Sequence, residues 1–185
     1  MLLSNIKENF ERKVIIKIVK KINISPKFIT LFSIVLMLIA SLFILNKNLQ
    51  IAALFVLLSG FFDILDGSLA KIKKCTTNFG VFFDRFSDRI SDTLLIGSII
   101  LTGYVDILLG IVLLSLVLIS SYESAVLEFL LKTNIGEKIS WRGIRLTIFI
   151  FGLLFNYIYY AAIAVTIISF YCFIERFYIA IKKLL

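Results

Sequence analysis

Long apolar stretches, separated by short polar segments, dominate the chain. They fall at residues 28–45, 51–65, 79–101, 107–131, 145–155 and 157–180. A helix needs about 20 residues to cross the hydrocarbon core of a bilayer, and the fifth stretch approaches that length only if its helix begins near Ser140. The pattern predicts an all-α integral membrane protein, a bundle of six transmembrane helices.

The first 27 residues have a different pattern. Phe10, Val14 and Ile18 recur at a spacing of four, with lysines on either side of the apolar face. This spacing is typical of an amphipathic helix that lies in the membrane interface, and a cationic tail that sets the topology is the alternative. We therefore divide the chain into a cytoplasmic juxtamembrane segment, residues 1–27, and a membrane domain, residues 28–185.

Composition supports the membrane assignment and narrows the chemistry. Hydrophobic residues make up 60% of the chain and the mean hydropathy is +1.01, which excludes a soluble globular protein. The absence of histidine excludes Ser-His-Asp and Cys-His catalysis and histidine-containing zinc sites. Cys75 and Cys172 are too far apart in sequence to form a metal-binding motif, and we expect both to be free thiols. Any chemistry must use carboxylates, hydroxyls and cations.

The net charge of +8 is explained by the predicted topology. Of the 20 Lys and Arg residues, seven lie in residues 1–27, five in 71–89, four in 132–145 and three near the C-terminus. With six spans these groups share one side of the membrane, and only Lys47 lies on the other. The positive-inside rule places that side, with both termini, in the cytoplasm. A role in binding nucleic acid is not needed to explain the charge.

Acidic residues inside the apolar segments are the exception to this pattern. Five aspartates lie between residues 63 and 92, and each would cost about 2.5–3.5 kcal/mol at the centre of a bilayer. On a helix Asp63 and Asp66 lie about 60° apart, and Asp84 and Asp88 about 40° apart. Two such faces brought together hold four negative charges, which repel one another unless a divalent cation lies between them.

The ligand chemistry indicates which cation that is. Carboxylate oxygens, with no histidine or cysteine beside them, favour a hard ion such as Mg²⁺, with Mn²⁺ or Ca²⁺ as alternatives. The candidate metal ligands are Asp63, Asp66, Asp84 and Asp88. In the alternative interpretation these aspartates mark the membrane boundary and form surface ion pairs with the nearby lysines and arginines.

The aspartates belong to a longer motif. It reads Asp63-x-x-Asp66-Gly67-x-x-Ala70-Lys71, eight further residues, then Gly80-x-x-x-Asp84-x-x-x-Asp88. This motif resembles the signature of the class I CDP-alcohol phosphatidyltransferases, and seven of its eight fixed positions match. The departure is Lys71, where the family has arginine; lysine keeps the charge but lacks the bidentate fork. The segment of residues 25–30 and the number of spans are also similar to the family.

The resemblance implies a homodimeric membrane enzyme that moves a phosphatidyl-type group from CDP-diacylglycerol or CDP-archaeol to a small alcohol, releasing CMP. It implies two Mg²⁺ ions, with Mn²⁺ as the alternative. Asp63, Asp66 and Asp84 would hold metal, and Asp88 would join the second metal and act as the base. The residues implied in binding the CDP-lipid are Ser25, Pro26, Gly67, Ala70, Lys71, Thr77 and Gly80.

The choice of base is also supported by the composition. Without histidine the proton acceptor has to be a carboxylate, and Asp88 lies one turn beyond the predicted ligand Asp84. Asp92 lies one turn further along, and we assign it no role.

The acceptor alcohol is indicated by a second stretch. Glu123-Ser124 and residues 141–146 resemble the inositol-phosphate branch of the family, although Ser120, Ser121 and Tyr122 stand where that branch has basic residues. Arg142 and Arg145 share a helix face and could clamp a phosphate, or they could be ordinary membrane anchors. We expect inositol phosphate as the acceptor, with glycerol phosphate and serine as alternatives. A non-enzymatic transporter is the alternative from another class, but it would spread its carboxylates along a path across the bilayer.

The departure at Lys71 leads to a test. If Lys71 contacts a phosphate of the CDP-lipid, Lys71→Met should weaken CDP-lipid binding, because the neutral side chain offers the phosphate no charge. Lys71→Arg should bind as well as wild type or better. Binding of the CDP-lipid to the purified variants checks this. An unchanged affinity in the Met variant would show that Lys71 is a solvated surface residue that does not contact the phosphate.

Overall fold

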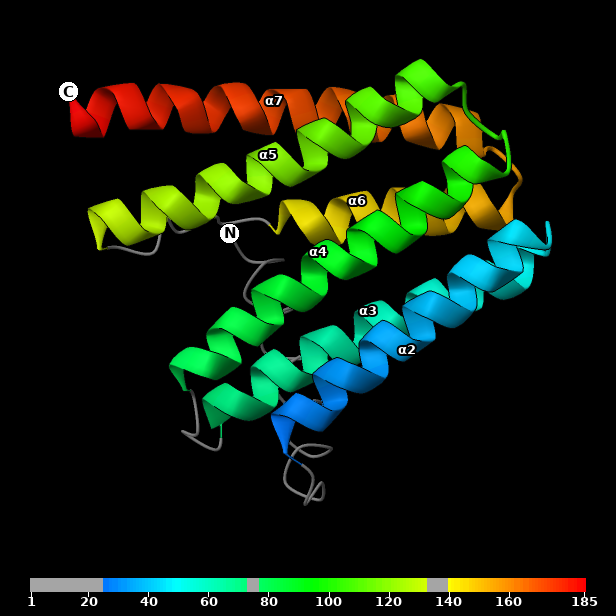
Figure 1. Cartoon of the computed structure of the whole chain (residues 1–185), viewed down its shortest axis with the longest axis horizontal. Coiled ribbons are helices and arrows are strands. Elements are labelled where there is room, and N and C mark those ends of the chain that lie inside the picture. Colours follow the sequence, from blue (N-terminus) through cyan, green and yellow to red (C-terminus); the bar gives the residue numbers. More distant parts are fainter. Residues whose placement is uncertain (1–24, 73–76, 133–139) are drawn as a thin grey trace, which may run out of the picture.

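The computed structural model of the protein describes residues 25–72, 77–132 and 140–185, with the backbone alone at Ala70 and Lys71. These ranges are all-α, as the apolar stretches predict (Figure 1). The helices are α2 (Pro26–Leu45), α3 (Leu49–Ile72), α4 (Asn78–Leu101), α5 (Ile107–Leu131), α6 (Trp141–Leu154) and α7 (Ile158–Leu184). The predicted interfacial helix in residues 1–27 lies outside the described residues.

The helix ends agree with most of the predicted spans and correct two of them. α4 and α5 follow the stretches 79–101 and 107–131 closely. α3 continues to Ile72, beyond the predicted end at residue 65, because the charged motif is itself helical. α6 begins at Trp141, directly after Ser140. The fifth helix therefore starts near Ser140, before the apolar stretch that begins at residue 145.

Side-chain caps fix the starts of three helices. In α4, α5 and α6 the side chain of the residue that precedes the helix accepts from one of the free backbone N–H groups of the first turn. Thr77 Oγ1 accepts from Gly80 N at 3.0 Å, Asp106 Oδ1 from Leu109 N at 2.9 Å, and Ser140 Oγ from Gly143 N at 3.2 Å. α2 begins instead with Pro26, whose fixed φ suits the first turn.

Three tight connections reverse the chain at residues 46–48, 102–106 and 155–157. Each contains one residue with positive φ: Lys47 at 61°, Gly103 at 73° and Asn156 at 59°. A left-handed residue of this kind ends a helix and turns the backbone away within a few residues. The helices are therefore joined as three antiparallel pairs, α2 with α3, α4 with α5 and α6 with α7.

The six helices close into a ring. Each packs against two neighbours, in the order α2, α3, α6, α7, α5, α4 and back to α2. Apolar side chains such as Met37, Val56, Ile99 and Leu153 fill the core of the bundle. α3 and α4 share the neighbour α2, and α6 packs on α3, so side chains from α3, α4 and α6 can meet inside the ring.

Charge is distributed unevenly between the two ends of the bundle. The three tight connections lie at one end, on the right in Figure 1, while α2, α4 and α6 begin and α3, α5 and α7 end at the other. The described basic residues gather at this second end, whereas Lys47 lies in the α2–α3 connection. The fold therefore has the charge asymmetry expected from the sequence. Which end faces the cytoplasm stays a prediction.

The chain is a multi-pass membrane protein. Four helical segments are long and apolar enough to cross a bilayer: Pro26–Leu45, Leu49–Leu69, Ile107–Leu131 and Ile158–Leu184. Large apolar side chains cover their outer faces, as Leu31, Val35, Leu38 and Leu42 do on α2. α4 is long enough but highly charged, and α6 has 14 residues, about 21 Å of helix. Length and composition thus identify four of the six predicted spans.

The contact between α6 and α7 provides a test of the packing. A Cβ added at Gly152 would lie 2.5 Å from Ala161 Cβ and 3.6 Å from Ile158 Cα, whereas one added at Gly97 on α4 would meet nothing within 4 Å. Gly152→Ala should destabilise the folded protein by about 1–3 kcal/mol, because the two helices must move apart. Gly97→Ala is the matched control and should be neutral or stabilising.

Thermal unfolding in detergent checks both variants. Equal unfolding temperatures for Gly152→Ala and Gly97→Ala would contradict the close α6–α7 contact.

Candidate active site

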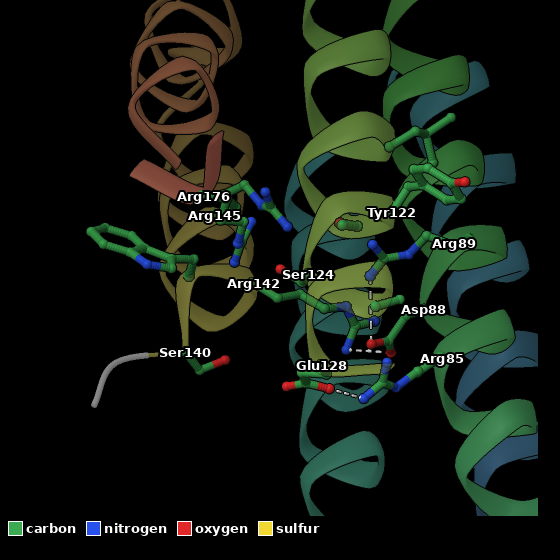
Figure 2. Close-up of a pocket in the computed structure, with 14 residues that line it drawn as sticks. Arg85, Asp88, Arg89, Tyr122, Ser124, Glu128, Ser140, Arg142, Arg145 and Arg176 are labelled. Atoms are coloured by element: carbon green, nitrogen blue, oxygen red, sulfur yellow. Dashed lines mark hydrogen bonds and ion pairs between the residues drawn. The ribbon is translucent and has the colours of Figure 1, made fainter. Parts of the chain in front are cut away.

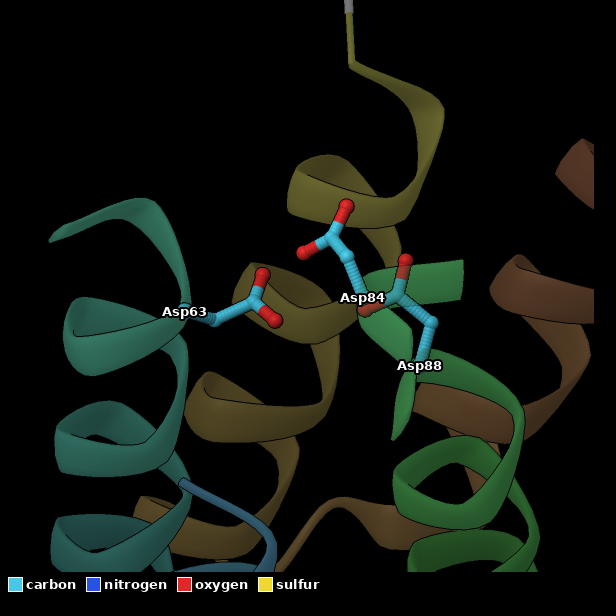
Figure 3. A group of neighbouring side chains, drawn as sticks. All are labelled: Asp63, Asp84 and Asp88. Carbon is cyan, nitrogen blue, oxygen red and sulfur yellow. The ribbon is translucent and has the colours of Figure 1, made fainter. Parts of the chain in front are cut away.

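Three aspartates from two helices form a carboxylate cluster at the basic end of the bundle. Asp63 projects from α3, and Asp84 and Asp88 project from successive turns of α4 (Figure 3). One carboxylate oxygen from each lies within 4.8 Å of the others, and the three side chains are half-buried. The spacing of the motif predicts four converging carboxylates, and three of them, without Asp66, meet in this cluster.

Asp66, the fourth predicted ligand, lies one turn beyond Asp63 on α3. It is 2% exposed, and Thr30 Oγ1 on α2 donates a hydrogen bond to its Oδ2. Its other oxygen, Oδ1, is buried and has no hydrogen-bond partner among the described residues. Thr30 therefore fixes one carboxylate oxygen and leaves the second available to a ligand.

Arg142, from the first turn of α6, reaches across to the same carboxylates. Its Nη1 lies 2.5 Å from Asp63 Oδ2 and 2.9 Å from Asp88 Oδ1, and its Nε lies 3.7 Å from Asp92 Oδ1. The side chain of Arg142 is 14% exposed. We expected this residue at the acceptor, and the structure places it between the acidic cluster and the neighbouring pocket.

Asp92, to which we assigned no role from the sequence, is one of the buried charges. Arg89 Nη2 lies 3.6 Å from Asp92 Oδ2 and 3.6 Å from Asp88 Oδ2. Together with Arg142, this side chain surrounds Asp92 with positive charge. Asp92 therefore acts here as a counter-ion that holds two arginines beside the cluster.

A pocket opens next to the cluster, between α4, α5, α6 and α7 (Figure 2). Its volume is about 430 Å³, and Asp88 lies on its wall. Its other charged lining residues are Arg85, Arg89, Glu128, Arg142, Arg145 and Arg176. Arg85 and Glu128 form an ion pair between α4 and α5 at its rim. The pocket carries a large excess of positive charge and is suited to an anionic ligand.

Two of the lining arginines are held by α5. Arg145 is buried and its Nη1 lies 3.4 Å from Ser120 Oγ, while Arg176 on α7 donates from Nη1 to the Ser120 carbonyl oxygen at 2.8 Å. We predicted Arg145 as a site residue but counted Arg176 only among the basic residues at the C-terminus. Its position, within an apolar helix and before the terminal lysines, is the signal that would have identified it.

The residues expected to bind the CDP-lipid lie at the same end of the bundle. Ser25 and Pro26 begin α2, and Thr77 caps α4 through Gly80. Gly67 lies on α3, and a Cβ added there would meet nothing within 4 Å. Ala70 and Lys71 follow on α3, and their side chains lie outside the described part of the chain.

The acidic cluster fits a divalent metal. Its donors are all carboxylate oxygens, the set that Mg²⁺ and Mn²⁺ prefer. Asp63 Oδ1 in the cluster, and Asp66 Oδ1 one turn away on α3, are buried without a hydrogen-bond partner in the described residues, so both have lone pairs to offer. Asp63 and Asp88 also form ion pairs with arginines, but the three clustered carboxylates are half-buried and converge on one another, which surface ion pairs alone do not explain.

Comparison with known families decides the identity. Residues 23–176 match the CDP-alcohol phosphatidyltransferase family, a range that includes the motif, the cluster and the pocket. The chain belongs to the CDP-alcohol phosphatidyltransferase family. It is therefore a membrane-embedded transferase of phospholipid synthesis, which confirms the resemblance of the motif.

Individual proteins of known sequence resemble this chain over different shares of its length. The archaetidylinositol phosphate synthase of Pyrococcus horikoshii is 30% identical over 97% of this chain and 94% of its own. That of Methanothermobacter thermautotrophicus is also 30% identical, over 89% of this chain and 87% of its own. An uncharacterized protein of Aquifex aeolicus is 43% identical over 40% of this chain and 38% of its own.

Solved structures share the fold of this phosphatidyltransferase. The phosphatidylinositol phosphate synthase of Mycobacterium tuberculosis with CDP-DAG bound has a TM-score of 0.74 and 21% identity, covering 90% of this chain and 92% of that chain. The same protein in complex with manganese and citrate has a TM-score of 0.72 and 21% identity, covering 88% and 85%.

The hydrogen bond from Thr30 to Asp66 leads to a test. Thr30→Val keeps the shape of the side chain but removes the donor, so Asp66 loses the bond that orients it. We expect about a 10- to 100-fold loss of Mn²⁺ affinity, the usual effect of losing a group that orients a metal ligand. Thr30→Ser keeps the hydroxyl and should restore most of the affinity.

Calorimetric titration with Mn²⁺ measures the three proteins. Equal affinities for the wild type and Thr30→Val would show that Thr30 has no part in orienting the ligand.

Proposed function

We propose that this phosphatidyltransferase transfers the phosphatidyl-type group of a CDP-lipid to inositol phosphate and releases CMP. The observation that carries the proposal is the position of Asp88, which belongs to the acidic cluster and also lines the arginine-rich pocket. One carboxylate therefore touches both the place expected for the CDP-lipid diphosphate and a place suited to a phosphorylated acceptor. The archaetidylinositol phosphate synthases that resemble the whole chain support this choice of acceptor.

The metal site consists of Asp63, Asp66, Asp84 and Asp88, and we propose that it holds two Mg²⁺ ions, with Mn²⁺ as a substitute. The bound ions would neutralise the negative charge of the diphosphate. Asp63 and Asp66 approach from α3, while Asp84 and Asp88 approach from α4. The Mycobacterium tuberculosis synthase, a structure of the same fold, is known in complex with manganese, which supports a divalent ion in this family.

The CDP-lipid is bound where three helix ends meet. α2 and α4 begin and α3 ends at the basic end of the bundle, and α2 packs on both of the others. The proposed binding residues are Ser25, Pro26, Gly67, Ala70, Lys71, Thr77 and Gly80. The small residues among them let the nucleotide approach the backbone, and Lys71 supplies a charge for phosphate.

The acceptor occupies the pocket of Figure 2. Arg142 and Arg145, assisted by Arg176, provide the positive charge that a phosphate monoester requires. A phosphate bound there places the rest of the acceptor near Asp88. Serine carries no phosphate and would leave these charges unpaired, so the pocket favours a phosphorylated acceptor, with glycerol phosphate as the second candidate.

Asp88 serves as the general base. It removes the proton from the acceptor hydroxyl, whose oxygen then forms a bond to the lipid-bearing phosphorus. The bond from that phosphorus to the oxygen of the CMP group breaks, and CMP leaves with the electron pair. The chain contains no histidine, so a carboxylate is the group available for this step.

Membrane placement follows from the same arrangement. We propose that α4 and α6 also cross the bilayer, which gives six spans, because each runs from the basic end of the bundle to the opposite end. The ion pairs of α4 with Arg142 and Glu128 offset its charge. The positive-inside rule puts the basic end, the active site and both termini in the cytoplasm.

We propose that the protein is a homodimer, as its resemblance to the family implies.

Release of CMP tests the proposed function. Purified protein is incubated with CDP-archaeol or CDP-diacylglycerol, Mg²⁺, and one of inositol phosphate, glycerol phosphate or serine. We expect release with inositol phosphate and much less with the other two. Release that is fastest with glycerol phosphate or serine would reassign the acceptor, and no release with any alcohol would contradict the enzymatic role.

The variant Asp88→Asn tests whether Asp88 is the general base or only a metal ligand. The amide cannot accept the proton, so turnover should fall by a factor of about 10²–10⁴ while CDP-lipid binding is largely retained. CMP release is measured as Mg²⁺ or Mn²⁺ is increased. If added metal restores nearly wild-type turnover, Asp88 is a ligand only and another group takes the proton.

A further inference from the structure

Arg142 joins the two halves of the site. Its guanidinium contacts Asp63 on α3 and Asp88 on α4 at 2.5 Å and 2.9 Å, and it also lines the pocket proposed for the acceptor. Among the described residues these two aspartates, with Asp84, are the ones whose oxygens converge closely enough to share a metal ion. One side chain therefore contacts the proposed metal ligands and faces the proposed acceptor.

A guanidinium and a divalent cation compete for these oxygens. Asp63 Oδ2 and Asp88 Oδ1 lie within ion-pair distance of Arg142 Nη1, so a metal ion drawn to the same carboxylates meets a positive charge beside it. Like charges at such separations repel strongly in a half-buried site. Metal binding and the Arg142 ion pairs therefore oppose one another.

An anionic ligand in the pocket offers Arg142 another partner. The pocket is also lined by Arg85, Arg89, Arg145 and Arg176, while Asp88 and Glu128 are its acidic residues. A phosphate bound among these arginines would attract the Arg142 guanidinium, and a bidentate arginine–phosphate contact is among the strong charge-assisted pairs. Arg142 bound to phosphate would leave the Asp63 and Asp88 oxygens to the metal.

We propose that Arg142 couples metal binding to acceptor binding, because it exchanges the carboxylates of Asp63 and Asp88 for the phosphate of the acceptor. This inference rests on the proposed function. The metal and the phosphate then favour the same position of Arg142, so each strengthens the binding of the other by the same factor. The enzyme would hold its metal most tightly when the acceptor is present.

Removal of the Arg142 charge tests the competition. Titration with Mn²⁺ in the absence of acceptor should give an affinity about 5-fold or more tighter for Arg142→Gln than for the wild type, a typical size for coupling between sites. If Arg142 served only to orient the two aspartates, the same variant would bind Mn²⁺ more weakly. The direction of the change thus separates the two roles, and weaker binding would overturn the proposal.

Arg145→Gln is the matched control. It removes the same charge one turn along α6, where the arginine contacts Ser120. A general electrostatic effect would tighten Mn²⁺ binding equally in both variants and would also overturn the proposal. Arg142→Lys keeps a cation at the position and should bind Mn²⁺ less tightly than Arg142→Gln. If Arg142→Gln unfolds, the Mn²⁺ affinity of Arg142→Lys is compared with that of the wild type instead, because the lysine variant keeps the charge.

The coupling itself is measured by repeating the titrations with saturating inositol phosphate, with inositol as the uncharged control and with a protein-free blank that corrects for Mn²⁺ bound by the phosphate. Inositol phosphate should tighten Mn²⁺ binding about 5-fold or more in the wild type and leave Arg142→Gln unchanged. Equal tightening in both proteins would overturn the coupling while leaving the proposed function intact. A wild type that binds no Mn²⁺ would overturn both.

Discussion

Negative charge inside an apolar helix bundle is the constraint on which the rest of the structure depends. Asp63, Asp84 and Asp88 approach one another within an assembly whose outer faces are covered by Leu, Val and Phe side chains. Carboxylates in such surroundings need cations, because neither lipid nor an apolar core can solvate them. The protein provides Arg142 and Arg89 among its own residues, and the converging carboxylate oxygens suit a divalent metal.

The fold satisfies this constraint through the order of its helices. Because each tight connection contains a left-handed residue, the chain returns repeatedly to the same end of the bundle. There the end of α3 and the starts of α2, α4 and α6 come together, which brings Thr30, the aspartates and Arg142 within reach of one another. The opposite end and the core contain no comparable cluster in the described residues and serve to hold these helices in register.

Local sequence predicted much of this architecture. The apolar stretches located six helices, and the i, i+3 and i, i+4 spacings of the aspartates predicted two acidic faces that meet. The sequence could not place Arg142, because its partners Asp63 and Asp88 are far away in the chain and depend on how α3, α4 and α6 close into a ring. Arg176 was missed for the same reason, since its contact with Ser120 is a tertiary one. Thr30 lay within a recognised segment, but its bond to Asp66 required the packing of α2 on α3.

The central claim is that the carboxylates of α3 and α4 form a metal site. Anomalous diffraction from crystals grown with Mn²⁺ tests it most directly, because the anomalous signal locates the ion without reference to activity. The account predicts manganese peaks between Asp63, Asp66, Asp84 and Asp88, and their loss in Asp63→Asn and Asp84→Asn crystals. Manganese found elsewhere in the protein, with none at these four carboxylates, would contradict it.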